Sequence, residues 1–261
     1  MSRLDEVRLE ADRTSTGLRT LDRLLEGGYP TGRAVLVCGP AGSGKTTMGL
    51  QFLLAGIEAG DTGAFVTVDE KPRHIVEDAH RLGWDLEPMM ANGRLALLDA
   101  SPFFTATRDR RRNGSSVDAQ QVASDLMRAV RKAGARRLVI DTLTSLVPPD
   151  MTPGEAHDYL RSLVQSLEDS MDCTLILTCR GSRGDPQRGC QAARYLTSGV
   201  VELRLACRSD GLVRQLRIRK MRGTPCDLAD HPLGIEPGVG LSLQGNTVDR
   251  GQAVLHTVAA G

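Results

Sequence analysis

Aromatic side chains are scarce in this chain, which contains three Tyr, four Phe and one Trp among its 261 residues. Proteins that hold single strands of nucleic acid stack the bases on aromatic rings, and few such platforms exist here. Lys and Arg total 33 against 32 Asp and Glu, so the net charge of +1 gives no general attraction to nucleic acid or to an anionic membrane. A nucleic-acid partner is therefore not expected.

Long apolar runs are absent as well. No run reaches the roughly 18 residues that a membrane-spanning helix needs. The charged residues 1–13 also lack the apolar stretch of a signal peptide. Both absences favour a cytoplasmic protein with no membrane partner.

The six cysteines show no metal-binding pattern. None belongs to a CxxC pair, and no His stands near them at zinc-ligand spacing. A thiol in an apolar strand acts as a small core residue. This setting applies to Cys38, Cys173, Cys179 and Cys207. We expect the cysteines to be reduced and inert.

The order of apolar and periodic segments predicts an α/β fold. Strand-like runs alternate with helical runs, as in a mostly parallel central sheet with helices on both faces. The expected strands are Ala34–Cys38, Ala64–Val68, Leu95–Leu98, Leu138–Ile140 and Cys173–Thr178, and the expected helices are Thr46–Ala59, Pro72–Leu82, Asp118–Ala133 and Pro153–Asp169. The length suits one domain, so we divide the chain into a polar arm (1–13), one domain (14–243) and a tail (244–261).

Local signals mark helix ends. Thr152 and Glu155 form a capping-box pattern, and Gly60 and Gly134 stand where C-caps belong. Further along, a hairpin signal at Ser209, Asp210 and Gly211 separates two strand-like runs. Those runs are Val200–Leu205 and Val213–Met221, and two arginine-bearing loops are expected at Thr105–Ser116 and Arg180–Gly189.

Residues Gly39 to Thr46 match the pattern GxxxxGK[ST] of a phosphate-binding P-loop, with an apolar strand before it and an apolar helix after it. Small residues let backbone N–H groups surround phosphates, and the helix N-terminus adds its positive dipole. We expect Lys45 to reach the β- and γ-phosphates of ATP, and the Thr46 hydroxyl to ligate Mg²⁺. The expected nucleotide-binding residues are Gly39, Ala41, Gly42, Ser43, Gly44, Lys45, Thr46 and Thr47.

Acidic residues follow two of the expected strands. Asp141 ends an apolar strand in the Walker B arrangement, so we expect it to complete the Mg²⁺ shell from the strand beside the P-loop. Asp69 and Glu70 follow another strand at the carboxyl edge of the sheet, where open α/β folds bind ligands. A carboxylate there can activate the water that attacks the γ-phosphate, and a solvated acidic turn is the alternative.

Two cations stand near the end of the last expected strand. Lys220 and Arg222 share parity with Leu216 and Ile218, so we expect all four side chains on one face. Cations that emerge together at a strand end suit an arginine-finger role toward a γ-phosphate across a subunit boundary. The alternative is a solvated pair of surface cations.

These motifs resemble those of the KaiC family, which belongs to the RecA superfamily of P-loop ATPases. The likeness runs from Arg13 to Leu243 and covers, besides the P-loop, the segments 16–18, 21–28, 83–86, 98–102 and 220–224. The resemblance implies a RecA-like fold with a C-terminal β-hairpin extension and a homo-oligomer, typically a hexameric ring, with ATP between subunits. It also implies that Lys220 and Arg222 act in trans.

Three departures from the family pattern qualify these expectations. Asp69 and Glu70 match a pair that is usually two glutamates, and the first of the pair is the usual base. Because Asp is one methylene shorter than Glu, we expect slow turnover. The clock protein of the family has two such domains and phosphorylates an adjacent Ser-Thr pair. This chain has one domain, and Arg194 and Tyr195 stand at that pair, so no clock-like phosphorylation cycle is expected.

The expected function is therefore a Mg²⁺-dependent, slow, KaiC-like ATPase that forms a ring and acts as a regulatory module through a protein partner. One alternative is a recombinase-like ATPase that binds single-stranded DNA through Arg180, Arg183 and Arg188, although no stacking aromatic precedes Tyr195. Another is a nucleotide-gated scaffold with negligible turnover.

Overall fold

The computed structural model describes residues 12–101, 119–148, 151–170, 172–181, 188–209 and 211–243. A nine-stranded sheet in the order β11-β10-β9-β8-β3-β7-β6-β4-β5 crosses this part of the molecule. Its strands are β3 (Ala34–Gly39), β4 (Gly63–Thr67), β5 (Leu95–Asp99), β6 (Arg137–Asp141), β7 (Thr174–Arg180), β8 (Gly199–Arg208), β9 (Gly211–Met221), β10 (His231–Glu236) and β11 (Gly240–Leu243). A second sheet pairs β1 (Arg13–Thr14) with β2 (Tyr29–Pro30).

Strand direction divides the large sheet into two parts. From β5 to β8 all neighbours are parallel, whereas β8, β9, β10 and β11 pair antiparallel. The expected α/β fold with a mostly parallel sheet is confirmed. The antiparallel part is larger than the expected hairpin, because β10 and β11 extend it.

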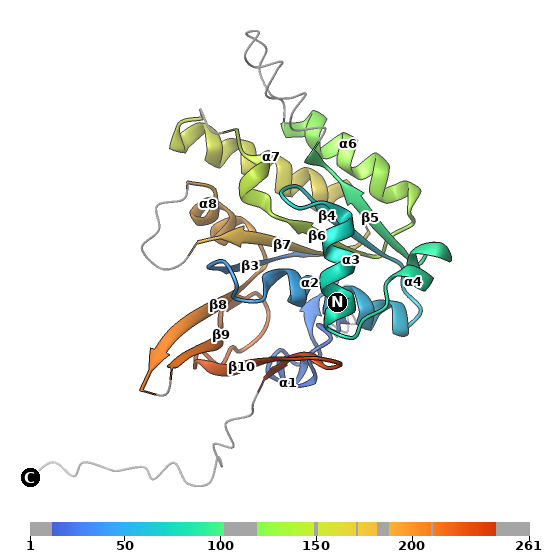
Figure 1. The fold of residues 1–261 in the computed structure, drawn as a ribbon. Coiled ribbons are helices and arrows are strands. Elements are labelled where there is room, and N and C mark those ends of the chain that lie inside the picture. The colour runs from blue at the N-terminus through green and yellow to red at the C-terminus, as the bar shows by residue number, and fades with distance from the viewer. Residues whose placement is uncertain are drawn as a thin grey trace, which may run out of the picture.

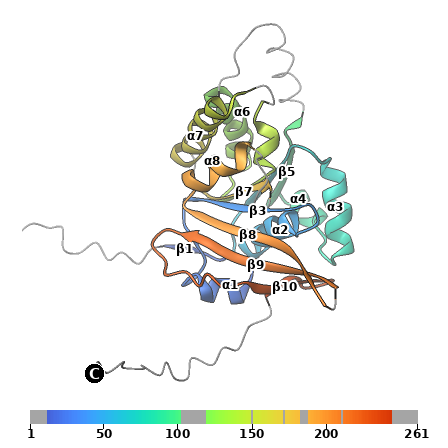
Figure 2. The same cartoon turned by 90° about the vertical axis from the view of Figure 1, so that its left-hand side faces the viewer.

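Helices cover both faces of the sheet (Figures 1 and 2). One face carries α6 (Ala119–Lys132), α7 (Pro153–Ser170) and α8 (Arg188–Leu196), and the other carries α1 (Arg19–Leu24), α2 (Lys45–Glu58), α3 (Pro72–Arg81) and α4 (Glu87–Ala91). Side chains of β3 alternate between the two cores, as strand geometry requires. Val35 and Val37 join the core on the α2 side, and Leu36 and Cys38 join the core on the α7 side.

The expected helix ends are present. The Thr152 backbone N–H donates to the Glu155 carboxylate (2.7 Å), and the Glu155 N–H donates to Thr152 Oγ1 (3.3 Å), which completes the capping box. Gly60 (φ 97°) and Gly134 (φ 61°) adopt the left-handed conformation that ends α2 and α6. None of the described helices combines the length and apolar character that a membrane span requires.

The segment between β7 and β8 contains a helix that the sequence analysis missed. The expected loop Arg180–Gly189 is interrupted at Arg188, where α8 begins. Among the described side chains of α8, Ala192 and Ala193 lie in the core and Leu196 packs against it, and so short an apolar pattern is not detectable in the sequence. The loop Thr105–Ser116, Asp210 of the hairpin turn and residues 1–11 and 244–261 lie outside the described residues. The division into arm, domain and tail stays a prediction.

The cysteines differ in part from expectation. Cys38 and Cys173 are buried free thiols, and burial raises the pKa of Cys38 to about 11 and that of Cys173 to about 12. Cys207 is free but exposed. Cys179 is disulfide-bonded, so the prediction that all six cysteines are reduced is wrong. A redox state depends on pairs brought together by the fold, which spacing alone did not reveal.

Candidate functional site

The loop from Gly39 to Thr46 joins β3 to α2, as its sequence predicts. Gly42 (φ 74°) and Gly44 (φ 102°) have positive φ values that favour glycine. A Cβ on Gly39 would lie 2.5 Å from the Leu203 carbonyl oxygen, so only glycine fits there. Ser43 is buried, and its Oγ has no hydrogen-bond partner among the described residues. A glycine-rich loop with an unsatisfied hydroxyl at a helix N-terminus fits a phosphate ligand.

Lys45 folds back over this loop. Its ammonium group donates to the carbonyl oxygens of Gly39 (3.0 Å) and Pro40 (2.9 Å). Burial lowers the pKa of Lys45, the Asp141 carboxylate opposes that shift, and the nearby charge of Arg180 adds to it. A lysine held by weak neutral acceptors can exchange them for phosphate oxygens, which are stronger partners for a cation.

Thr46 and Asp141 meet at the start of α2. The Thr46 hydroxyl donates to Asp141 Oδ2 at 2.6 Å, and the Thr178 hydroxyl donates to Asp141 Oδ1. The prediction that Asp141 lies on the strand beside the P-loop strand is wrong, because β7 separates β3 from β6. A hydroxyl and a carboxylate are oxygen ligands of the kind that Mg²⁺ prefers. Thr47 follows in the first turn of α2, and Ala41 is exposed in the loop.

Asp69 lies beyond β4 and is already engaged. Its Oδ2 accepts hydrogen bonds from the Ser145 hydroxyl (2.7 Å) and from Arg180 Nη2 (3.0 Å). Arg180 ends β7, and Ser145 lies in the short helix η1 (Leu143–Leu146) that follows β6. Three strand ends therefore converge on one carboxylate, as expected where parallel strands end at one edge.

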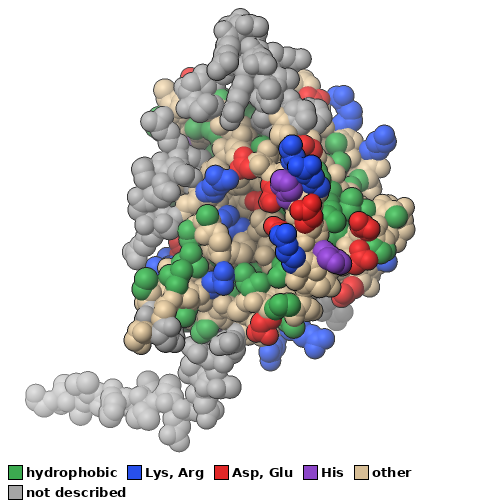
Figure 3. Space-filling view, in the orientation of Figure 1, with side chains coloured by type: hydrophobic (Ala, Val, Ile, Leu, Met, Phe, Trp, Pro, Cys, Tyr) green, Lys and Arg blue, Asp and Glu red, His purple; other side chains and the backbone are tan. Residues whose placement is uncertain are grey.

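Glu70 stands beside Asp69 in a different environment. No hydrogen bond to its carboxylate is recorded among the described residues, although its backbone carbonyl accepts one from Thr67 Oγ1 (2.6 Å). Burial raises the pKa of Glu70, the charges of Asp78 and Asp141 add to the shift, and His74 opposes it. On the face of the molecule shown in Figure 3, charged side chains also gather over α3. The Glu70 carboxylate therefore binds a proton more readily than an ordinary glutamate does.

Lys220 lies on the opposite face from the one expected. Leu216 and Ile218 belong to the core on the α2 side. A β-bulge leaves Arg219 between Ile218, which pairs with Val201, and Lys220, which pairs with Val200. The prediction that Lys220 shares the face of Leu216 and Ile218 is therefore wrong, because one extra residue reverses the alternation.

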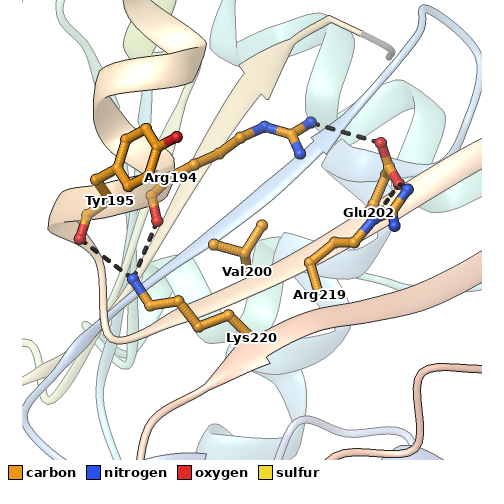
Figure 4. Close-up of a pocket in the computed structure, with 6 residues that line it drawn as sticks. All are labelled: Arg194, Tyr195, Val200, Glu202, Arg219 and Lys220. Carbon is orange, nitrogen blue, oxygen red and sulfur yellow. Dashed lines mark hydrogen bonds and ion pairs between the residues drawn. The ribbon is translucent and has the colours of Figure 1, made fainter.

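The Lys220 ammonium group caps the C-terminus of α8. It donates to the backbone carbonyl oxygens of Arg194 (3.0 Å) and Tyr195 (3.2 Å), as Figure 4 shows. Burial lowers the pKa of Lys220, and the charge of Arg222 adds to the shift. Arg222 follows the end of β9 with an exposed side chain that has no hydrogen bond or ion pair to any described residue.

A pocket of about 320 Å³ adjoins Lys220. Arg194 from α8 and Arg219 from β9 both reach the buried carboxylate of Glu202, at 3.5 Å and 2.7 Å (Figure 4). Val200 and the exposed Tyr195 complete the lining. With three cations and one carboxylate, this surface carries net positive charge.

Register places Lys220 and Arg222 at the amino edge of the parallel strands. Met221 pairs with Gly199, and Gly199 pairs with Val35 at the start of β3, whereas the P-loop begins at Gly39. Val35 and Gly39 are four residues apart along β3, which is roughly 13 Å at 3.3 Å per residue. These cations therefore do not reach the P-loop of the same chain.

Three residues at the carboxyl edge were not predicted as site residues, namely Ser145, Thr178 and Arg214, and Arg180 was considered only as a DNA contact. Arg214 on β9 donates from Nε to the Gly42 carbonyl oxygen at 3.1 Å. Thr178 ends the predicted strand Cys173–Thr178, and Arg180 follows two residues later. A position at the carboxyl end of a strand in an open α/β sheet could have identified both as site residues. Ser145 and Arg214 carried no sequence signal.

The parallel sheet with its P-loop defines a RecA-like ATPase domain. A family model described as the KaiC ATPase matches residues 14–247, and this chain belongs to the KaiC family of ATPases. The likeness stated from the sequence motifs is confirmed.

Individual relatives agree with this assignment. The chain is 32% identical over 222 residues to the circadian clock oscillator protein KaiC of Picosynechococcus sp., a match covering 84% of this chain and 42% of that protein. It is 30% identical over 229 residues to a UPF0273 protein of Thermotoga maritima, covering 85% of this chain and 92% of that one. The chain thus spans less than half the length of the clock proteins it matches.

A solved structure supports the same fold. The crystal structure of a KaiC-like protein from Pyrococcus horikoshii OT3 superposes with a TM-score of 0.75 at 30% identity. The match covers 90% of this chain and all of that chain.

Proposed function

We propose that the protein is a Mg²⁺-dependent ATPase with slow turnover that works as a homo-oligomeric ring with ATP at the subunit boundaries. The observation that carries this proposal is the 2.6 Å contact between Thr46 Oγ1 and Asp141 Oδ2 at the N-terminus of α2. It joins two residues separated by 95 positions and places two oxygen ligands beside the P-loop lysine.

The P-loop residues bind and orient the nucleotide in this scheme. Lys45 exchanges the carbonyls of Gly39 and Pro40 for β- and γ-phosphate oxygens, and backbone N–H groups from Ala41 to Thr47 surround the phosphates. Thr46 and Asp141 would hold Mg²⁺ through their side-chain oxygens. When bound, that ion neutralises charge on the terminal phosphates.

A carboxylate beyond β4 accepts the proton of the attacking water. Asp69 matches the usual base of the family, but its Oδ2 is engaged by Ser145 and Arg180. Glu70 has the raised pKa and lies in the field of Asp141, which favours Glu70 as the base. Slow turnover is expected because the residue in the usual position is both shorter and hydrogen-bonded elsewhere.

Lys220 and Arg222 complete the site of a neighbouring subunit. They lie at the wrong edge of the sheet for their own P-loop, and the Arg222 side chain projects without a partner among the described residues. A cation supplied across a boundary stabilises charge on the transferring phosphoryl group. The family resemblance favours six subunits, and a regulatory protein partner is the expected reader of the nucleotide state.

A nucleotide-gated scaffold is the second candidate function. The hydrogen bonds that hold Asp69 favour it, because they remove one candidate base from the water. The DNA-binding alternative has no such support. Of the three arginines expected to contact DNA, Arg180 pairs with Asp69. Arg183 and the side chain of Arg188 lie outside what the structure describes.

The test compares Lys45→Ala with the exposed control Lys132→Ala. Wild-type protein and the control should bind ATP in a calorimeter and release phosphate only with Mg²⁺. Lys45→Ala should lose ATP binding while its circular dichroism stays unchanged, because Lys45 contacts the loop and not the core. Retention of wild-type ATP affinity by Lys45→Ala would disprove the proposal, and binding without phosphate release would establish the scaffold.

A further inference from the structure

Arg180 occupies a central position at the carboxyl edge. It is the register partner of Gly39, the first residue of the P-loop, across the parallel pairing of β7 with β3. From there its guanidinium group reaches Asp69 at 3.0 Å, and its charge also acts on Lys45. Arg180 thus stands between the phosphate loop and the carboxylates that follow β4.

The pair with Asp69 is exposed and can be exchanged. The Arg180 side chain is 59% exposed and the Asp69 side chain 35% exposed, and exposed ion pairs contribute little to stability. A terminal phosphate carries more charge than one carboxylate and offers several acceptor oxygens. A triphosphate seated on the P-loop would therefore compete well for the guanidinium group.

We propose that Arg180 senses the γ-phosphate of ATP by exchanging its bond to Asp69 for a bond to the terminal phosphate. This inference rests on the proposed function, because it needs a triphosphate in the P-loop. Release of Arg180 leaves Asp69 bound to Ser145 alone and free to orient beside Glu70. Arg180 is a nucleotide-binding residue in this scheme, and it positions Asp69 only through their shared bond.

The exchange predicts a difference between triphosphate and diphosphate. A contact to the terminal phosphate forms with ATP and not with ADP. Loss of a charge-assisted hydrogen bond should weaken binding of a non-hydrolysable ATP analogue by about tenfold or more in Arg180→Gln, with ADP affinity unchanged. Arg180→Lys, which keeps the charge, should retain part of the discrimination.

Asp69→Asn supplies the opposite change. Without the carboxylate, Arg180 has no competing anion, so the triphosphate analogue should bind more tightly while ADP does not. The double variant Arg180→Gln/Asp69→Asn should lose this gain, because both changes act through one bond. Arg81→Gln is the matched control, since Arg81 forms a similarly exposed pair with Asp78 on α3.

Isothermal titration of both nucleotides, with Mg²⁺, into the full chain decides between outcomes. A selective loss of triphosphate affinity in Arg180→Gln, absent in Arg81→Gln, supports the proposal. Equal loss for both nucleotides, or no loss, overturns it while the proposed function stands. If wild-type protein binds no triphosphate at all, the proposed function fails and this inference fails with it.

Discussion

At the carboxyl edge of the parallel strands, Thr46 bonds to Asp141 and Arg180 bonds to Asp69, whereas at the amino edge Lys220 and Arg222 lie far from the P-loop of the same chain. The first group comes from segments distant in sequence that the sheet brings together. The second group comes from one short stretch at the end of β9. Under the proposed function, the contrast means that one chain supplies two halves of two different sites.

The largest effect should come from removing Arg222, whose side chain has no hydrogen bond or ion pair to any residue that the structure describes. Arg222→Ala should bind ATP normally and lose about 10³-fold or more in turnover, as loss of an arginine finger does in other P-loop enzymes. Calorimetry and steady-state phosphate release measure the two quantities. Arg222 is a cleaner choice than Lys220, because Lys220 also caps α8. If turnover is unchanged in Arg222→Ala, Arg222 has no catalytic role.

The sequence predicted the carboxyl edge better than the amino edge, for a physical reason. The P-loop and Asp141 belong to continuous motifs whose spacing follows from a strand–loop–helix unit. The face of Lys220 depended on a bulge at Arg219, which one strand's alternation cannot reveal. The contact between Asp69 and Arg180 joins two strand ends separated by 111 residues, and no local pattern specifies it.

A variant at the buried Arg137 tests whether the amino edge can be destabilised without a loss of turnover. Arg137 begins β6, is buried, pairs with Asp61 (2.9 Å), and donates to the carbonyls of Ser15 and Phe52. Arg137→Met should lower the free energy of unfolding by about 3 kcal/mol, because it leaves a charge and two carbonyls without their partner. Denaturant unfolding measures this.

Its exposed neighbour provides the control. Arg136→Met should unfold like wild type. Turnover per folded molecule should stay normal in both variants. If Arg137→Met instead reduces turnover selectively, the amino edge contributes to the site of its own subunit.

A smaller effect should distinguish the two carboxylates of the carboxyl edge. Glu70→Gln should lower turnover by about 10²-fold, whereas Asp69→Glu should raise it modestly by restoring reach. Below its raised pKa, Glu70 is protonated and cannot accept a proton, so wild-type turnover should fall as the pH decreases through that value, above the usual 4.5. The rate of phosphate release, measured as a function of pH, shows this fall on the acidic side. Loss of activity in Asp69→Asn but not in Glu70→Gln would assign the base to Asp69.

The central claim, that each site is shared between subunits, is tested by mixing two inactive variants. Lys45→Ala lacks the phosphate-binding half, and Arg222→Ala lacks the cation of the other half. In a mixed ring, some boundaries place an intact P-loop beside an intact Arg222, so phosphate release should return to a substantial fraction of wild type. Native mass spectrometry should confirm that mixed rings form. If mixed rings form and no activity returns, Lys220 and Arg222 do not complete a neighbour's site.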